Sequence, residues 1–169
     1  MTKNKILSLA GVVSRVRKAR KAGKIIVTTN GCFDLLHPGH VHYLEKAKAL
    51  GDLLIVGVNS DDSVRKNKEK GRPINPEKTR LAMLAGLVAV DYVFAFREKD
   101  PIRFLNAIRP DIHVKGGDYR GRILEQDTVE KNHGRVRLLK FLPGHSTTRT
   151  IARILRTCGG KGRGKKRDA

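Results

Sequence analysis

The chain has 169 residues, a formal net charge of +20, and 39% hydrophobic residues. This length and composition suffice for one domain with an apolar core, and they exclude a chain that is disordered throughout. No apolar run approaches the ~20 residues that a membrane span needs. The two cysteines, Cys32 and Cys158, lie far apart and predict neither a disulfide framework nor a metal cluster. They suit a reducing compartment, so we expect a cytoplasmic protein.

Positive charge is concentrated at both ends of the sequence. Residues 1–24 hold eight Lys or Arg and no acid, and residues 159–169 hold five basic residues and one Asp. We expect residues 1–23 to form a basic helical extension and residues 159–169, where glycines alternate with the basic residues, to be a disordered basic tail. Such charge suits nucleic-acid binding as an alternative function. With three Tyr, five Phe and no Trp, however, the chain lacks an evident platform for base stacking.

Between the two ends, short β-branched runs alternate with helix-like segments, which is typical of a parallel α/β domain over residues 24–158. The strands are predicted at residues 24–29, 53–59, 92–96, 112–115 and 135–139. The helices are predicted at residues 41–50, from Asn75 as N-cap to about Val88, and after Ser146 as N-cap to about Arg156. The polar, lysine-rich residues 60–74 are expected to form a surface loop over a site.

The densest chemical signal lies in residues 28–40, between the first strand and the first helix. An open parallel sheet places its ligands at such a turn. Gly31 lets a phosphate approach the backbone, and Gly39 keeps the helix entrance free of a side chain. His37 and His40 can then both donate hydrogen bonds to phosphate oxygens and stabilise the charge that grows there. The alternative is a pair of loop histidines that cap the turn.

At this point the sequence resembles the HxGH nucleotidylyltransferases, which share a Rossmann-like fold with a parallel sheet flanked by helices. The motifs that carry the resemblance occur in family order, at residues 37–40, 58–61, 71–75, 114–119 and 146–148. Within that family the chain is most similar to the D-glycero-β-D-manno-heptose 1-phosphate adenylyltransferases, which occur alone or as one half of a bifunctional kinase and adenylyltransferase. The second resemblance is to glycerol-3-phosphate cytidylyltransferase, which usually has Thr in place of Cys32.

The resemblance implies transfer of AMP from ATP to a sugar 1-phosphate with release of pyrophosphate. It assigns catalytic roles to His37, His40 and Lys48. It places ATP on Thr29, Asn30, Gly31, Phe33, Gly39, Lys115, Gly116, Gly117, Asp118, Ser146, Thr147 and Thr148. It places the acceptor on Asp34, Asn59, Asp61 and Arg80.

Simpler structural roles remain open for several of these residues. Lys48 can be an ordinary solvated lysine, with Lys46 as its control, and Arg80 can face solvent. Residues 116–117 can form a tight turn, and Ser146 can merely cap a helix. No acidic cluster forms a metal cage, so Mg²⁺ is expected to arrive on the ATP oxygens. The resemblance also suggests a homodimer, and it is weakest at residues 120–133, which leaves the acceptor open.

Overall fold

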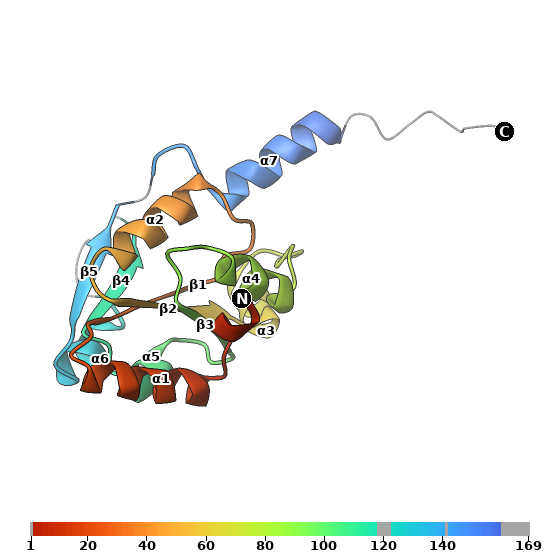
Figure 1. Cartoon of the computed structure of the whole chain (residues 1–169). Coiled ribbons are helices and arrows are strands. Elements are labelled where there is room, and N and C mark those ends of the chain that lie inside the picture. The colour runs from red at the N-terminus through yellow and green to blue at the C-terminus, as the bar shows by residue number, and fades with distance from the viewer. Residues whose placement is uncertain (1, 118–122, 141, 160–169) are drawn as a thin grey trace.

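The centre of the molecule is a five-stranded parallel sheet in the order β3-β2-β1-β4-β5 (Figure 1). The computed structural model describes residues 2–117, 123–140 and 142–159. The strands are β1 (Ile26–Gly31), β2 (Leu53–Asn59), β3 (Tyr92–Phe96), β4 (Ile112–Gly116) and β5 (Arg135–Leu139). The chain runs outward in one direction from β1 through β2 to β3, and then continues on the other side of β1 with β4 and β5. The predicted α/β class with a parallel sheet flanked by helices is confirmed.

Helices cover both faces of this sheet, as Figure 1 shows. On one face lie α1 (Leu9–Lys21), α5 (Ile102–Ile108) and α6 (Gln126–Lys131). On the other face lie α2 (Pro38–Lys48) and α4 (Glu77–Ala85), while a short 3₁₀ turn, Thr2–Lys5, contacts α4. The short helix α3 (Asp61–Asn67) follows β2, and α7 (Thr147–Cys158) extends away from the body. Among the described residues, none of the helices combines the length and apolarity needed to cross a membrane.

The apolar core consists of one layer on each face of the sheet. Val27 and Leu44 belong to the layer under α2 and α4, and Ile26 and Phe104 belong to the layer under α1 and α5. Val12 of α1 is fully buried in the second layer. Each such side chain contributes about 1.5–3 kcal/mol through removal of apolar surface from water. Helix α1 is therefore an integral part of the core, in addition to carrying basic residues.

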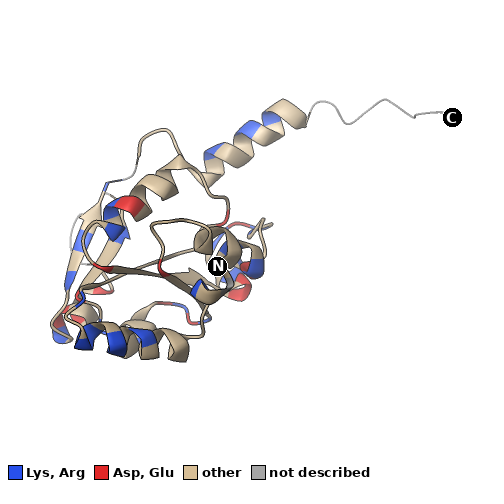
Figure 2. Ribbon diagram, in the orientation of Figure 1, with Lys and Arg blue, Asp and Glu red and all other residues tan. Residues whose placement is uncertain are grey.

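Much of the positive charge lies on the outer surface of the body. Figure 2 shows Lys and Arg on α1, on α7 and along β5. On α1, the basic side chains alternate with the buried Val12 and Val16, so they point to solvent. This arrangement gives an ordinary amphipathic helix, whose apolar stripe packs on the sheet and whose charged stripe is hydrated.

Several local predictions differ from the structure. The helix predicted at residues 41–50 begins earlier, at Pro38, and the strand predicted at residues 24–29 spans Ile26–Gly31. Residues 60–74 contain α3, because the Ser60 hydroxyl accepts from the Ser63 amide at 3.2 Å and Val64 is fully buried. A helix of seven residues makes about two turns, too few for a visible period. Helix α4 has Pro76 rather than Asn75 at its N-cap, because the Asn75 side chain is used elsewhere, and it ends at Ala85. Helices α5 and α6 are comparably short and were not predicted.

Candidate active site

A cavity of about 690 Å³ lies at the carboxyl ends of β1, β2 and β4. This size is typical of a small-molecule site. The strand order reverses between β1 and β4, so the cavity lies where open parallel sheets bind their ligands. It is lined by Asn30, Gly31, Cys32, Phe33, Asp34, His40, Tyr43, Asn59, Asn67, Lys68, Glu69, Arg72, Lys115, Gly116, Thr147 and Thr148.

The two histidines of the motif lie together at the N-terminus of α2. Pro38 begins the helix, and His37 occupies the N-cap position without a side-chain cap bond. The rings of His37 and His40 stack, with centroids 3.8 Å apart and planes inclined by 19°. A Cβ atom at Gly39 would lie 3.1 Å from Nδ1 of His37 and 3.3 Å from Cβ of His145. Glycine at this position therefore gives the first imidazole room beside the helix entrance.

The environment favours the uncharged form of both histidines. Burial, reinforced by the neighbouring His37, lowers the pKa of His40 to about 4, and the Leu35 carbonyl only partly opposes this shift. Burial and His145 also lower the pKa of His37. In the described part of the chain, Nδ1 of neither ring has a hydrogen-bond partner with full geometry. An anion near the rings would favour their protonated forms and would supply the missing partner.

A second helix N-terminus meets the cavity beside the histidines. The Ser146 hydroxyl accepts from the Arg149 amide at 3.2 Å and caps α7, while Thr147 and Thr148 line the cavity. The Thr147 hydroxyl also donates to the Leu35 carbonyl at 3.4 Å, which links α7 to the loop before α2. Two helix N-termini, of which that of α7 also carries hydroxyl groups, meet at one cavity and favour a bound anion.

Thr29 does not reach the cavity. Its side chain is completely buried, and its hydroxyl lies 2.7 Å from the hydroxyl of Tyr43. The Tyr43 hydroxyl in turn donates to the Val114 carbonyl at 2.9 Å. The expected contact of Thr29 with a phosphate is therefore corrected to a role inside the sheet. Tyr43, one helical turn after His40, is among the residues that line the cavity, and sequence analysis missed it.

Lys48 also lies away from the cavity, at the opposite end of α2 from the histidines. Its ammonium group is 2.6 Å from the Asp91 carboxylate and also donates to the Asp52 carbonyl. Both partners precede strands of the sheet, whereas the cavity lies where strands end. The expected phosphate contact is corrected to a structural ion pair. Lys68, which follows α3, lines the cavity instead, and the lysine-rich composition of residues 60–74 was the available signal.

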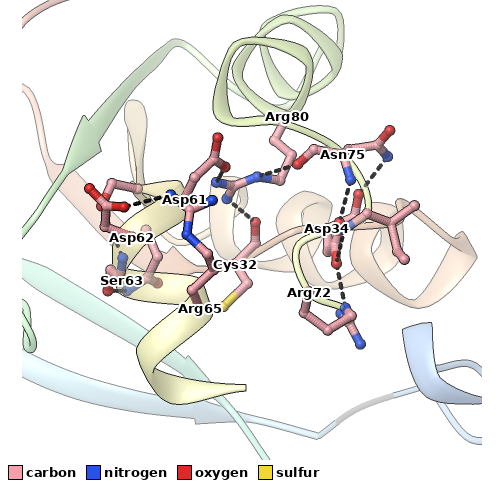
Figure 3. A network of polar contacts seen from close by, with 12 residues as sticks. Cys32, Asp34, Asp61, Asp62, Ser63, Arg65, Arg72, Asn75 and Arg80 are labelled. Carbon is pink, nitrogen blue, oxygen red and sulfur yellow. Dashed lines mark hydrogen bonds and ion pairs between the residues drawn. The ribbon is translucent and has the colours of Figure 1, made fainter. Parts of the chain in front are cut away.

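Arg80 is fully buried and its guanidinium is occupied by the protein (Figure 3). It donates from Nε to the Asn75 carbonyl at 3.0 Å, from one terminal nitrogen to the Cys32 carbonyl at 2.6 Å, and from the other to Asp61 at 2.8 Å. Neither Arg80 nor Asp61 lines the cavity. The predicted substrate contacts of this pair are replaced by a clamp that joins the segments after β1, after β2 and before α4.

The wall at the end of β4 is polar and constrained. The Lys115 ammonium group is 2.6 Å from the buried Glu125 carboxylate and donates to the Asn30 side chain at 3.4 Å. Gly116 lines the cavity, and Gly117 has a φ of 134°, a conformation that L side chains rarely adopt. Asp118 lies outside the described residues.

At the end of β1, Phe33 lines the cavity with a positive φ of 47°. A Cβ at Gly31 would lie 3.1 Å from the Phe33 ring, so this glycine permits the tight approach of that ring. At the end of β2, the strand next to β1, Asn59 lines the cavity and donates to the Ser63 hydroxyl at 3.0 Å. Within the described ranges, no group of three or more His, Cys, Asp or Glu is arranged to hold a metal ion.

The sequence matches the cytidylyltransferase-like family over residues 28–151, which identifies the class as a nucleotidyltransferase and agrees with the parallel sheet and the crevice that His40 lines. The chain belongs to this family. It is 55% identical over 150 residues to the "Bifunctional protein HldE" of Methylococcus capsulatus, a match that covers 88% of this chain and 32% of the relative. It is 50% identical to the protein of the same name from Haemophilus influenzae, with the same coverage. The chain thus spans about a third of the length of the curated relatives that it matches.

Two crystal structures share the fold. A "lipopolysaccharide core biosynthesis protein" from Thermoplasma volcanium is 36% identical, with a TM-score of 0.60, and the match covers 71% of this chain and 98% of that one. A pantoate-beta-alanine ligase from Francisella tularensis is 15% identical, with a TM-score of 0.53 and coverage of 89% and 78%. The second similarity concerns the fold alone.

Proposed function

We propose that the chain transfers AMP from ATP to D-glycero-β-D-manno-heptose 1-phosphate, which gives ADP-heptose and pyrophosphate. The observation that carries this proposal is His40, which lines the switch-point crevice near the start of α2 beside the N-terminus of α7, with the His37 ring stacked on it. The heptose acceptor is supported by the loop at residues 71–75 and by relatives named as bifunctional proteins and as a lipopolysaccharide core biosynthesis protein.

In the proposed reaction, an oxygen of the acceptor phosphate attacks the α-phosphorus of ATP. The new P–O bond forms as the bond from the α-phosphorus to the bridging oxygen breaks, and pyrophosphate leaves with the electron pair. No covalent enzyme intermediate is needed, so the residues act by positioning and by charge stabilisation. His37 and His40 would donate hydrogen bonds to the α- and β-phosphates. Thr147, Thr148 and the free amides of α7 would hold the leaving pyrophosphate.

Lys68 replaces Lys48 in this scheme as the lysine that contacts the phosphates, because it lines the cavity and Lys48 does not. Mg²⁺ would come with the triphosphate and supply further charge neutralisation. The lining suits this role, because most of its polar groups are hydroxyl, imidazole, amide and cationic groups that bind phosphate oxygens. Of its two carboxylates, Asp34 and Glu69, the first is already bonded to Arg72 and to two backbone amides.

ATP is proposed over CTP as the nucleotide. The base and ribose would lie beside Lys115 and Gly116, where a close approach of backbone allows hydrogen bonds to the base edge. A site that pairs with one base leaves buried polar groups unpaired with another, and such mismatches cost ~10²-fold or more in kcat/KM.

A matrix of substrates tests this function. Pyrophosphate release is measured with ATP or CTP against heptose 1-phosphate, glycerol 3-phosphate and other sugar 1-phosphates. We expect release with ATP and heptose 1-phosphate. Preference for CTP and glycerol 3-phosphate would instead identify a glycerol-3-phosphate cytidylyltransferase. Binding of polyanions with a steep salt dependence, without pyrophosphate release from any pair, would favour the nucleic-acid-binding alternative.

A homodimer is the proposed assembly, and exposed apolar side chains near the end of α4 support it. Val88 is 95% exposed and Met83 is 40% exposed. Burial of these side chains against a second copy would remove their apolar surface from water. Sedimentation equilibrium tests the assembly, with Val88→Asp as the variant expected to shift it toward monomer.

A further inference from the structure

Asp34 is a buried carboxylate that ties two distant segments together beside the cavity. It is 1% exposed and accepts three hydrogen bonds: from Arg72 Nε at 2.5 Å, from the Ile74 amide at 3.0 Å and from the Asn75 amide at 2.8 Å. The Asn75 side chain returns a hydrogen bond to the Asp34 carbonyl at 2.7 Å. Figure 3 shows this group next to the Arg80 clamp, with Asn75 bonded to both. Residues 72–75 are thereby fixed to the loop after β1.

Arg72 is held by this carboxylate at the surface of the cavity. Its side chain is 12% exposed and lines the cavity, whereas the Arg80 side chain is completely buried. A guanidinium has five N–H donors, and the bond to Asp34 uses the one on Nε. In the part of the chain that the structure describes, no further hydrogen bond of the Arg72 guanidinium is made. Its two terminal nitrogens therefore retain a fork of donors suited to a phosphate or carboxylate.

Arg72 lies on a different side of β1 from Lys115 and Gly116, the residues proposed to lie beside the base and ribose. Lys115 and Gly116 end β4, on one side of β1, whereas Asn59 ends β2 on the other side. The chain between Asn59 and α4 carries Arg72, so this arginine belongs to the β2 side of the cavity. A nucleotide at the reversal of strand order, between β1 and β4, leaves the β2 side for the second substrate.

We propose that Arg72, oriented by Asp34, forms the binding site for the phosphate of the sugar 1-phosphate acceptor. This inference rests on the proposed function, in which that phosphate is the nucleophile. Two anions must approach each other when a phosphate monoester attacks the α-phosphorus, and Arg72 offsets their repulsion from the acceptor side. Asp34 is a positioning residue, because its oxygens bond to Arg72 and to backbone amides rather than to substrate.

Steady-state kinetics of Arg72→Gln and Arg72→Lys test the site, with ATP and heptose 1-phosphate varied separately. We expect Arg72→Gln to raise the KM for heptose 1-phosphate at least ~10-fold and to change the KM for ATP less than ~2-fold, since a charged bidentate contact is lost on one substrate only. Arg72→Lys should recover part of the loss, because it restores charge without the fork. Arg65→Gln is the control, because Arg65 is exposed on α3 and pairs with Asp62.

The results separate this inference from the proposed function. If the wild-type protein forms no ADP-heptose, the proposed function fails. If the wild-type protein is active but Arg72→Gln retains its KM for the acceptor, or raises the KM for ATP instead, the assignment of Arg72 is refuted. Calorimetric titration of heptose 1-phosphate, without nucleotide, gives a readout independent of turnover, and Arg72→Gln should weaken this binding by a similar factor.

A double-mutant cycle tests the positioning role of Asp34. Asp34→Asn keeps the shape of the side chain but weakens the bond to Arg72 Nε. We expect it to raise the acceptor KM and to add little further effect in the Arg72→Gln background, because both changes remove one interaction. Equal and additive effects of Asp34→Asn in both backgrounds would refute positioning through Arg72.

Discussion

Replacement of the buried Arg80 by Met tests whether this arginine is a structural clamp. Methionine has a similar length but no donors, so it leaves the Cys32 carbonyl, the Asn75 carbonyl and the Asp61 carboxylate without their partner. An unsatisfied buried acceptor costs about 1–3 kcal/mol. Asp61 is 28% exposed, so water compensates part of its loss. Together these effects predict a loss of about 3–5 kcal/mol in the free energy of unfolding.

Urea unfolding and thermal melts measure this loss. For a chain of this length, 3–5 kcal/mol corresponds to a decrease of roughly 6–20 °C in Tm. Arg65→Met is the matched control, because its side chain is 58% exposed and its ion pair lies on the surface of α3. It should change stability by less than about 0.5 kcal/mol. If Arg80→Met keeps wild-type stability but raises the KM of the acceptor tenfold, Arg80 contacts substrate, as the family resemblance implied, and the clamp is refuted.

Three further predictions concern ionisable side chains. His40→Ala should lower turnover ~10²-fold or more and weaken ATP binding less, and near-normal turnover would contradict its role. Lys48→Ala should leave kcat and KM unchanged. It should reduce the free energy of unfolding by at most about 1 kcal/mol, because the ion pair of Lys48 with Asp91 is partly exposed. A large loss of kcat would restore the catalytic assignment of Lys48. Burial lowers the pKa of His113 from 6.5 to about 3, so the unfolded chain binds more protons between these values and stability should fall as pH falls below 6.5. Urea unfolding between pH 7 and 5 should show this slope, about 1.4 kcal/mol per pH unit at most from this residue, and His113→Leu should flatten it.

The inner strands could be predicted from sequence because burial on both faces requires continuous apolar, β-branched runs. Residues 53–59 and 92–96 were predicted with the observed bounds, and so were residues 135–139, which form a mostly exposed strand at the edge of the sheet. The short helices were not accessible in the same way. Helix α3 buries few side chains, and its formation depends on the Ser60 cap and on contact with the sheet. Whether such a segment is helical therefore depends on tertiary packing, which cannot be read from a short stretch of sequence.

Within the cavity, sequence reasoning worked best where backbone chemistry defines the site. The turn at residues 28–40 was singled out because glycines and a helix start have local signatures. Of this segment, residues 30–34 and His40 line the cavity, whereas Thr29, His37 and Gly39 do not. Side chains on helices were harder to assign. Tyr43 and Lys48 both lie on α2, yet Tyr43 reaches the cavity and Lys48 lies at the far end. The two residues lie at different positions along the helix axis, and the sequence motif alone does not show how far from the cavity each one lies.

The two arginines near residue 75 show why the acceptor side was the least predictable part of the site. Arg72 and Arg80 are both basic residues next to a turn, and their immediate sequence does not say which one faces a ligand. The difference comes from distant partners: Asp34 binds Arg72 by one nitrogen, whereas Cys32, Asp61 and Asn75 together occupy Arg80. An arginine whose three nitrogens all have partners within the protein stabilises the fold, and one whose terminal nitrogens remain free at a cavity can bind an anion. Long-range hydrogen bonding therefore determines which of the two guanidinium groups is available to bind an anion at the cavity.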